Sequence, residues 1–153
     1  MIGQAAVRAA EPDEAAAVAA LVDAAYAKYV PRIGRKPAPM LVGYTDLIAK
    51  KAVYVLPGAS GLRGVLVIMP DEEGMFLENI AVHPDAQGQG LGRQLMAFVE
   101  EAARARNLPA IHLYTNEAMT ENLAFYTRLG YEETGRRTED GYRRVFFRKQ
   151  LTA

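Results

Sequence analysis

The residues whose types and spacing best suit chemistry lie between Asn79 and Arg93, where an apolar strand pattern, a glycine-rich turn and a helix start follow one another directly. Glycines at 88, 90 and 92 leave no side chains where the main chain would approach a ligand. The first turn of the helix offers N–H groups without intrahelical partners and carries a partial positive charge. The pattern therefore predicts a cradle for an anion, with phosphate as the expected guest.

Two common phosphate motifs do not fit this loop. A dinucleotide fingerprint needs a third glycine where Arg93 stands, and a P-loop needs Gly-Lys-Ser or Gly-Lys-Thr where Gly92, Arg93 and Gln94 stand. A glycine-rich strand-to-helix turn without a ligand is the simpler alternative. A bare turn needs about one residue at positive φ, whereas alternating glycines suit several N–H groups that converge on one anion.

Two segments resemble the GNAT superfamily of N-acetyltransferases. Gln87, Gly90 and Gly92 are spaced as in its acetyl-CoA pyrophosphate loop, after a strand that ends in Val-His-Pro. Residues 122–131, Asn-Leu-Ala-Phe-Tyr-Thr-Arg-Leu-Gly-Tyr, resemble its Asn, Phe-Tyr, Leu-Gly-Tyr signature. The resemblance implies acetyl-CoA as cosubstrate, held by Ile80, Ala81, Val82, Gln87, Gly88, Gln89, Gly90, Leu91, Gly92, Arg93, Asn122 and Tyr126.

The same resemblance assigns catalytic roles. Tyr126 would donate a proton to the departing thiolate, and Asn122 would hold the pantetheine arm; a core position for Tyr126, at helical spacing from Leu123 and Leu129, is the alternative. Attack on a thioester needs a neutral amine, so a general base is useful. Strand alternation puts Glu78 on the face of Phe76 and Ile80, which makes Glu78 our candidate, although a solvent-facing Glu78 or a base acting through water would also fit.

Other features limit the reaction and the acceptor. His83 is the second candidate for the base. Without cysteine or a G-x-S-x-G nucleophile, we expect direct attack in a ternary complex. A small-molecule primary amine is the expected acceptor; a peptide or protein N-terminus, and a non-catalytic acyl-CoA-binding sensor, are the alternatives. The acceptor pocket is predicted to be lined by Tyr26, Tyr29, Ile33, Met40, Tyr44 and Glu78.

Composition bounds the partners. A chain of 153 residues suits one domain over 1–153, and 18 basic against 18 acidic residues predict binding to neither nucleic acid nor membrane. Early charges such as Arg8 and Glu11 break any signal-peptide core, and the absence of cysteine suits the cytoplasm. No metal is expected, because His83 and His112 are isolated from ligand spacings. The basic residues between Arg136 and Lys149 are interpreted as a solvated hairpin face, and the resemblance makes a homodimer plausible.

The periodicity predicts an α+β fold with a mixed, mostly antiparallel central sheet of six to seven strands flanked by about four helices. Strands are expected at Val7 and at 53–56, 64–69, 75–82, 111–114, 131–134 and 142–147. Helices are expected from Glu11 to about Lys28, from Gly90 to about Asn107, and over 119–129, where Gly130 caps the last. Pro31 is predicted to end the first helix, and 29–43 to be irregular. A helix between strands 75–82 and 111–114 forms a crossover connection, which implies that these two strands run parallel. The order of strands and helices resembles that of GNAT proteins over essentially the whole chain.

Overall fold

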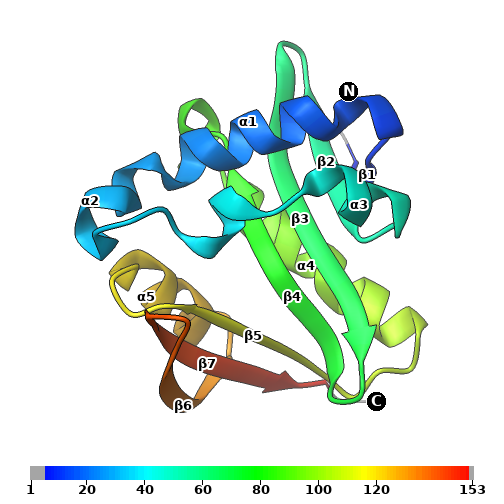
Figure 1. Ribbon diagram of the computed structural model, residues 1–153. Helices are drawn as coiled ribbons and strands as arrows, with labels where there is room; N and C mark the ends of the chain where they lie inside the picture. The colour runs from blue at the N-terminus through cyan, green and yellow to red at the C-terminus, as the bar shows by residue number, and fades with distance from the viewer. Residues whose placement is uncertain (1–5, 152–153) are drawn as a thin grey trace. The chain divides into compact units, whose positions relative to one another are not determined.

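The computed structural model describes residues 6–151, which form one seven-stranded sheet and five α-helices (Figure 1). The strands are hydrogen-bonded in the order β1-β2-β3-β4-β5-β7-β6. The strands are β1 Arg8–Ala9, β2 Val53–Gly58, β3 Gly61–Asp71, β4 Gly74–Val82, β5 Ala110–Asn116, β6 Glu132–Glu139 and β7 Tyr142–Gln150. The helices are α1 Ala15–Tyr26, α2 Val30–Ile33, α3 Tyr44–Ala49, α4 Leu91–Ala105 and α5 Thr120–Arg128.

Strand direction confirms the predicted fold class. β4 and β5 run parallel, with Met75–Leu77 opposite Ile111–Leu113, and α4 joins them as the expected crossover helix. The pairs β1–β2, β2–β3, β5–β7 and β6–β7 are antiparallel. The sheet is therefore mixed and mostly antiparallel, as predicted.

The chain divides into two compact units. Unit 1 comprises Met1–Ile68 and Asn79–Phe98, and unit 2 comprises Met69–Glu78 and Val99–Ala153. The divisions fall inside β3, β4 and α4, so each of these elements contributes to both units.

Unit 1 has its core around β3 and the helix that follows β1. The predicted stripe on α1 is buried, including Val18, Leu21 and Val22. β3 is buried without interruption from Gly64 to Ile68, which is the pattern of a strand covered on both faces. On one of those faces Leu95 of α4 lies against Gly64, at 3.0 Å from where a Cβ would stand.

The segment after α1 differs from the prediction. The helical path does not end at Pro31: α1 ends at Tyr26, a 3-10 turn covers Ala27–Tyr29, and α2 follows. Pro31 is the second residue of α2, where helix geometry leaves the N–H without a partner, so proline costs nothing there. The segment predicted to be irregular also contains a 3-10 helix over Ala38–Leu41, and α3 was not predicted at all.

An ion pair fixes the start of α1 to β1. Both Arg8 Nη atoms donate to the Glu14 carboxylate, at 2.7 and 2.9 Å, and the Glu11 N–H donates to the same carboxylate at 2.8 Å. Chiefly because of the Arg8 hydrogen bonds, the pKa of Glu14 falls from 4.5 to about 2. Folding therefore favours the ionised form of the Glu14 carboxyl group.

Glu14→Gln should lower the free energy of unfolding by about 1 kcal/mol at pH 7, since one well-aligned ion pair is removed. A lowered folded-state pKa stabilises the protein above the unfolded pKa, and this contribution disappears as the pH falls from 4.5 toward 2. Urea midpoints of the two proteins should therefore differ at pH 7 and approach each other in acid. Glu101→Gln on exposed α4 surface is the control, and a Glu14→Gln deficit that stays constant into acid would refute the assignment.

Unit 2 is built on β5, β7 and β6 with α5 on one face. Ile111, Leu113 and Phe147 are buried, and the Phe147 ring lies 5.8 Å from that of Tyr126 on α5. The predicted glycine cap of α5 is confirmed: Gly130 has φ +90°, and the Tyr131 N–H donates to the Tyr126 carbonyl at 3.0 Å, as in a Schellman motif. Among residues 6–151 there is no helix with the length and apolarity needed to cross a membrane.

The residue after this cap buries a hydroxyl at a cost. Tyr131 is 3% exposed, its hydroxyl has no hydrogen-bond partner among residues 6–151, and burial raises its pKa. Tyr131→Phe should raise the free energy of unfolding by about 1 kcal/mol, because the unpaired hydroxyl is removed and the ring contacts stay. Urea denaturation checks this, and a loss of stability would mean that the hydroxyl has a favourable role.

Candidate active site

The loop that joins β4 to α4 has the shape of an anion cradle. β4 ends at Val82, a 3-10 turn covers Pro84–Ala86, and the first α4 hydrogen bond runs from the Gln94 N–H to the Gly90 carbonyl at 3.1 Å. Helix geometry leaves the earlier N–H groups of this turn, from Leu91 to Arg93, without intrahelical acceptors. Leu91 is 4% exposed and anchors the turn. The helix therefore presents amide donors at a fixed position in unit 1.

Two loop glycines have a conformation that disfavours other residues. Gly88 has φ +81° and Gly90 has φ +78°, both in the left-handed region. A Cβ added at either position would meet no atom of residues 6–151 within 4 Å. The backbone turn thus requires glycine, and the space beside these two α-carbons is open.

An arginine that the sequence reasoning did not identify lies beside the loop. Arg63 on β3 donates through Nη2 to the Gln89 side chain, and its carbonyl accepts the His83 N–H at 2.9 Å. Gln87 turns back toward β4 and donates to the Val82 carbonyl at 3.4 Å. The guanidinium of Arg63 therefore lies at the edge of the loop. This contact depends on β3 lying beside β4 in the sheet, and the loop sequence alone does not show it.

Glu78 lies on the half-buried face of β4. Phe76, Glu78 and Ile80 are half-buried, whereas Leu77 and Asn79 between them are buried. Within unit 2 this face continues across the sheet as an aromatic row: Phe76 to Tyr114 is 5.8 Å and Tyr114 to Phe146 is 5.5 Å between ring centroids. The Tyr114 pKa is raised first by burial and also by the negative charge of Glu78, with Arg144 opposing. Glu78 thus belongs to a partly desolvated surface.

The second resembling segment forms α5. Asn122 donates to Thr115 Oγ1 on β5 at 3.3 Å. Tyr126 is 4% exposed, and its ring contacts Phe125 at 5.3 Å and Tyr131 at 5.8 Å between centroids. The hydrogen bond of Asn122 and the ring contacts of Tyr126 therefore attach α5 to the core of unit 2.

Comparison with known families identifies the fold family. The model of the acetyltransferase (GNAT) domain matches residues 2–133. The chain belongs to the GNAT family. Mycothiol acetyltransferase of Cellulomonas flavigena is 34% identical over 100 residues, 64% of this chain and 28% of that protein. Ribosomal protein bS18-alanine N-acetyltransferase of Escherichia coli K12 is 32% identical over 76 residues, 50% of each chain.

The chain spans half or less of the length of these two relatives. Solved structures match it more completely. A GNAT acetyltransferase from Streptococcus agalactiae has a TM-score of 0.80 at 18% identity, over 96% of this chain and 95% of that one. PaiA N-acetyltransferase from Thermoplasma acidophilum, solved in complex with coenzyme A, has a TM-score of 0.79 at 12% identity, over 95% and 98%. These structural neighbours show the GNAT fold.

Two of the predicted acceptor residues of this GNAT chain form hydrogen bonds with a buried asparagine. Asn79 is 5% exposed; its Oδ1 accepts from the Tyr26 hydroxyl at 2.7 Å, and its Nδ2 donates to the Tyr44 hydroxyl at 3.0 Å. The Tyr26 and Tyr29 rings are 6.0 Å apart. The other two predicted residues, Ile33 and Met40, are half-buried. Asn79 ties α1 and α3 to β4 one residue after Glu78, and the strand pattern alone did not identify it.

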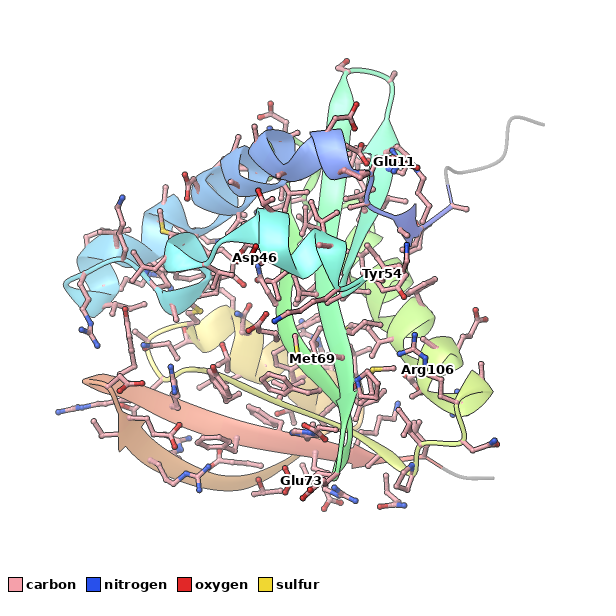
Figure 2. The ribbon with its side chains drawn as sticks, turned by 45° about the vertical axis from the view of Figure 1, so that its right-hand side comes forward. Glu11, Asp46, Tyr54, Met69, Glu73 and Arg106 are labelled. Atoms are coloured by element: carbon pink, nitrogen blue, oxygen red, sulfur yellow. The ribbon has the colours of Figure 1, made fainter. Side chains whose placement is uncertain are left out.

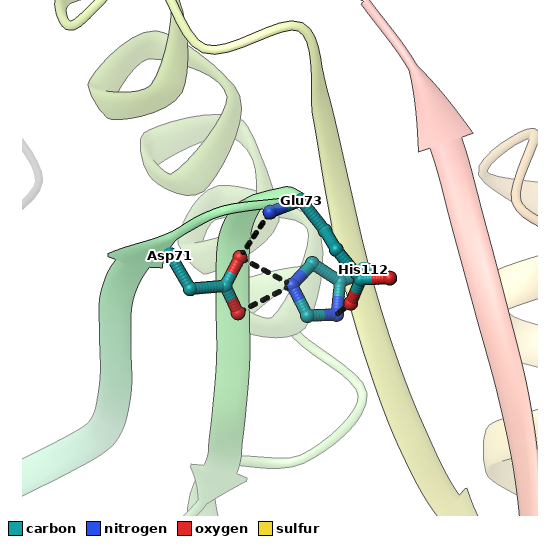
Figure 3. Close-up of side chains that lie close together, drawn as sticks. All are labelled: Asp71, Glu73 and His112. Atoms are coloured by element: carbon teal, nitrogen blue, oxygen red, sulfur yellow. Dashed lines mark hydrogen bonds and ion pairs between the residues drawn. The ribbon is translucent and has the colours of Figure 1, made fainter.

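A cluster at the other end of β4 corrects one sequence-based statement. His112 is not isolated: its Nε2 lies 2.9 and 2.7 Å from the two oxygens of Asp71, and its Nδ1 lies 3.8 Å from Glu73 Oε2 (Figure 3). Figure 2 shows Glu73 at the turn between β3 and β4. Asp71 also accepts the Glu73 and Gly74 N–H groups, at 2.9 and 3.1 Å. We assign this cluster to fastening the turn to β5, because Asp71 contacts both His112 on β5 and two N–H groups of the turn.

Proposed function

We propose that this chain transfers an acetyl group from acetyl-CoA to a primary amine of a small molecule, by direct attack in a ternary complex. The observation that carries the proposal is the loop: two glycines in left-handed conformation lead into the amide donors of α4, in a chain of the GNAT family. The PaiA neighbour was solved with coenzyme A, which supports the same cofactor here.

In this proposal, main-chain groups form most of the contacts with the cofactor. We propose that amides from Gly88 to Arg93 bind the diphosphate, with the α4 N-terminus supplying partial positive charge. The polar main-chain groups of Ile80 and Val82 would pair with the pantetheine arm as a strand does. An N–H at Ala81 or Val82 would then steady the oxyanion of the tetrahedral intermediate. The side chains near this loop orient it, and Arg63 adds a positive charge at its edge.

Glu78 is proposed as the general base. A lysine-like amine with a pKa of about 10.4 is neutral about once in 2,500 molecules at pH 7, a cost of about 4.6 kcal/mol. A carboxylate on a half-buried strand face can accept the ammonium proton, directly or through one water. The amine then attacks the thioester carbonyl, the oxyanion forms, and its collapse expels the CoA thiolate.

Tyr126 is proposed, on the family resemblance, to protonate that thiolate, with Asn122 holding the arm. A thiol with a pKa of about 8.5 already leaves near neutrality, so Tyr126→Phe should keep at least about a tenth of the wild-type kcat. Stopped assays with equal concentrations of folded protein measure this. Undetectable turnover in a Tyr126→Phe protein with a wild-type melting temperature would contradict it.

The acceptor is proposed to be small, because Tyr26, Tyr29, Ile33, Met40 and Tyr44 bring aromatic and apolar groups to one part of unit 1. The names of the two relatives support different acceptor classes: one is named for mycothiol and the other for an alanine of a ribosomal protein. From chain length and the absence of cysteine, we also propose one transferase domain over 1–153 that acts in the cytoplasm, and from the family resemblance we propose that it forms a homodimer.

Incubation with acetyl-CoA and a panel of amines and peptides, with free thiol followed over time, tests the proposal. Acceptor-dependent thiol release with small amines supports it, and release with peptides alone would move the acceptor to protein N-termini. Saturable acetyl-CoA binding with no acceptor-dependent release would make the chain a sensor and refute the proposed activity.

A further inference from the structure

A cavity in unit 2 is lined by arginines. Its volume is about 310 Å³, and it is formed by β6, β7 and the segment after β5. Its lining residues are Glu117, Arg136, Arg137, Thr138, Arg143 and Arg144. Four guanidinium groups around one small cavity, against one carboxylate in its lining, favour an anionic occupant.

The four arginines are not equally engaged. Arg136 is fully used, since it contacts Glu133 at 2.9 Å and Glu117 at 3.0 Å. Arg137 is 64% exposed and lies 3.8 Å from Glu139, and Arg143 is 80% exposed and lies 3.9 Å from Glu117. These two long contacts leave guanidinium donors that can be redirected to a ligand.

Arg144 is the least exposed of the arginines that these ion pairs describe. Its side chain is 13% exposed, one nitrogen donates to Glu139 at 3.0 Å, and its guanidinium lies 4.3 Å from the Tyr114 ring centroid. Arg137 stacks in the same way on Phe146, at 4.1 Å. Stacking holds the planar forks in place while their edges remain able to bind a carboxylate in bidentate fashion.

These aromatic rings connect the cavity to Glu78. Tyr114 and Phe146 are opposite each other on β5 and β7, and Phe76, two residues before Glu78 on β4, packs on Tyr114. The negative charge of Glu78 and the positive charge of Arg144 both act on Tyr114. β4 and β7 are two strand spacings of about 4.8 Å apart, so an anion bound at Arg144 lies roughly 10 Å from an amine at Glu78.

We propose that this cavity binds the anionic end of the acceptor, so that the substrate class is an amine bearing a carboxylate about eight bonds away. The inference rests on the proposed function, because it takes Glu78 as the place of the amine. Arg144 and Arg137 bind the carboxylate, and Phe76, Tyr114 and Phe146 contact the aliphatic stem between the two ends. This assigns a specific role to part of the basic surface that the sequence reasoning interpreted as solvated.

A matched pair of acceptors tests this proposal. 8-Aminooctanoate and 8-aminooctanamide have the same amine and the same length, and only the first has a carboxylate charge for the arginines to bind. The wild-type kcat/KM should be at least about tenfold higher for the carboxylate, chiefly through KM. Arg144→Gln and Arg137→Gln should each reduce that preference, whereas Arg106→Gln, on an exposed residue after α4, should leave it unchanged.

The variants also separate charge from fork geometry. Arg144→Lys should keep part of the preference, since it retains the charge and loses the bidentate fork. Because Arg144 is largely buried, melting temperatures are compared first, and exposed Arg137 supplies the variant that leaves packing intact. Equal kcat/KM for the two acceptors in the wild type, or an unchanged preference in both glutamine variants, would overturn the proposal.

A binding measurement keeps this inference distinct from the proposed function. Both probes are titrated calorimetrically into protein with and without CoA. Tighter binding of the carboxylate, lost in Arg144→Gln, supports the cavity even if no thiol is ever released and the transferase proposal fails. Equal binding of the two probes refutes the cavity even if thiol release shows that transfer occurs.

Discussion

Gly90→Val should weaken CoA binding about 100-fold. The φ of +78° puts Gly90 in the left-handed region, which valine avoids, so the loop amides move away from the diphosphate. A new side chain also occupies the open space where the phosphate is proposed to lie. Loss of two charge-assisted hydrogen bonds costs about 3 kcal/mol, which corresponds to about 100-fold in Kd. Calorimetric titration with CoA measures this.

Gly34→Val separates ligand contact from backbone strain. Gly34 caps α2 with φ +88°, and a Cβ there would also meet no atom within 4 Å. Both variants should therefore lose a similar amount of stability, about 1–2 kcal/mol, but only Gly90→Val should lose affinity for CoA. Equal loss of affinity in the two variants would show that strain alone is responsible.

Glu78→Gln should reduce kcat/KM about 100-fold at pH 7, which is the usual contribution of a general base. The neutral fraction of the amine rises tenfold per pH unit below its pKa, so the variant should recover as the pH rises while the wild type changes less. The check is the ratio of wild-type to variant kcat/KM from about pH 6.5 to 9.5 with one amine. A ratio that does not change with pH would mean that Glu78 acts by charge or packing.

Two further variants complete this experiment. Glu72→Gln removes an exposed carboxylate in the β3–β4 turn and should leave kcat/KM unchanged. If His83 is the base instead, His83→Gln shows the pH-dependent deficit and Glu78→Gln does not.

Much of the fold followed from local patterns in the sequence. The α1 stripe, the β2, β3 and β4 runs and the Gly130 cap depend on periodicity or on one conformational preference, and these can be recognised without tertiary information. The prediction for the segment after Tyr26 was wrong, because Pro31 was interpreted as the end of a helix. Proline suits the first turn of a new helix equally well, and only the surrounding packing decides between the two.

The candidate site also has parts that the sequence predicts and parts that it does not. The glycine loop could be recognised because its residues are consecutive. Arg63 beside Gln89, the Asn79 hydrogen bonds to Tyr26 and Tyr44, and the contact of His112 with Asp71 join residues between 26 and 53 positions apart. Such contacts follow from strand register, which the sequence does not specify to the residue. For the same reason, the arginine cavity was interpreted as ordinary exposed surface.

Main-chain amides after residue 87 are proposed to hold the diphosphate of the acyl donor. Calorimetric titration of the wild-type protein with CoA and with pantetheine, which lacks every phosphate, measures what these amides contribute to binding. We expect saturable CoA binding at least about 100-fold tighter than pantetheine binding, and loss of that difference in Gly90→Val. Absence of saturable CoA binding, or equal affinity for the two compounds, would contradict it.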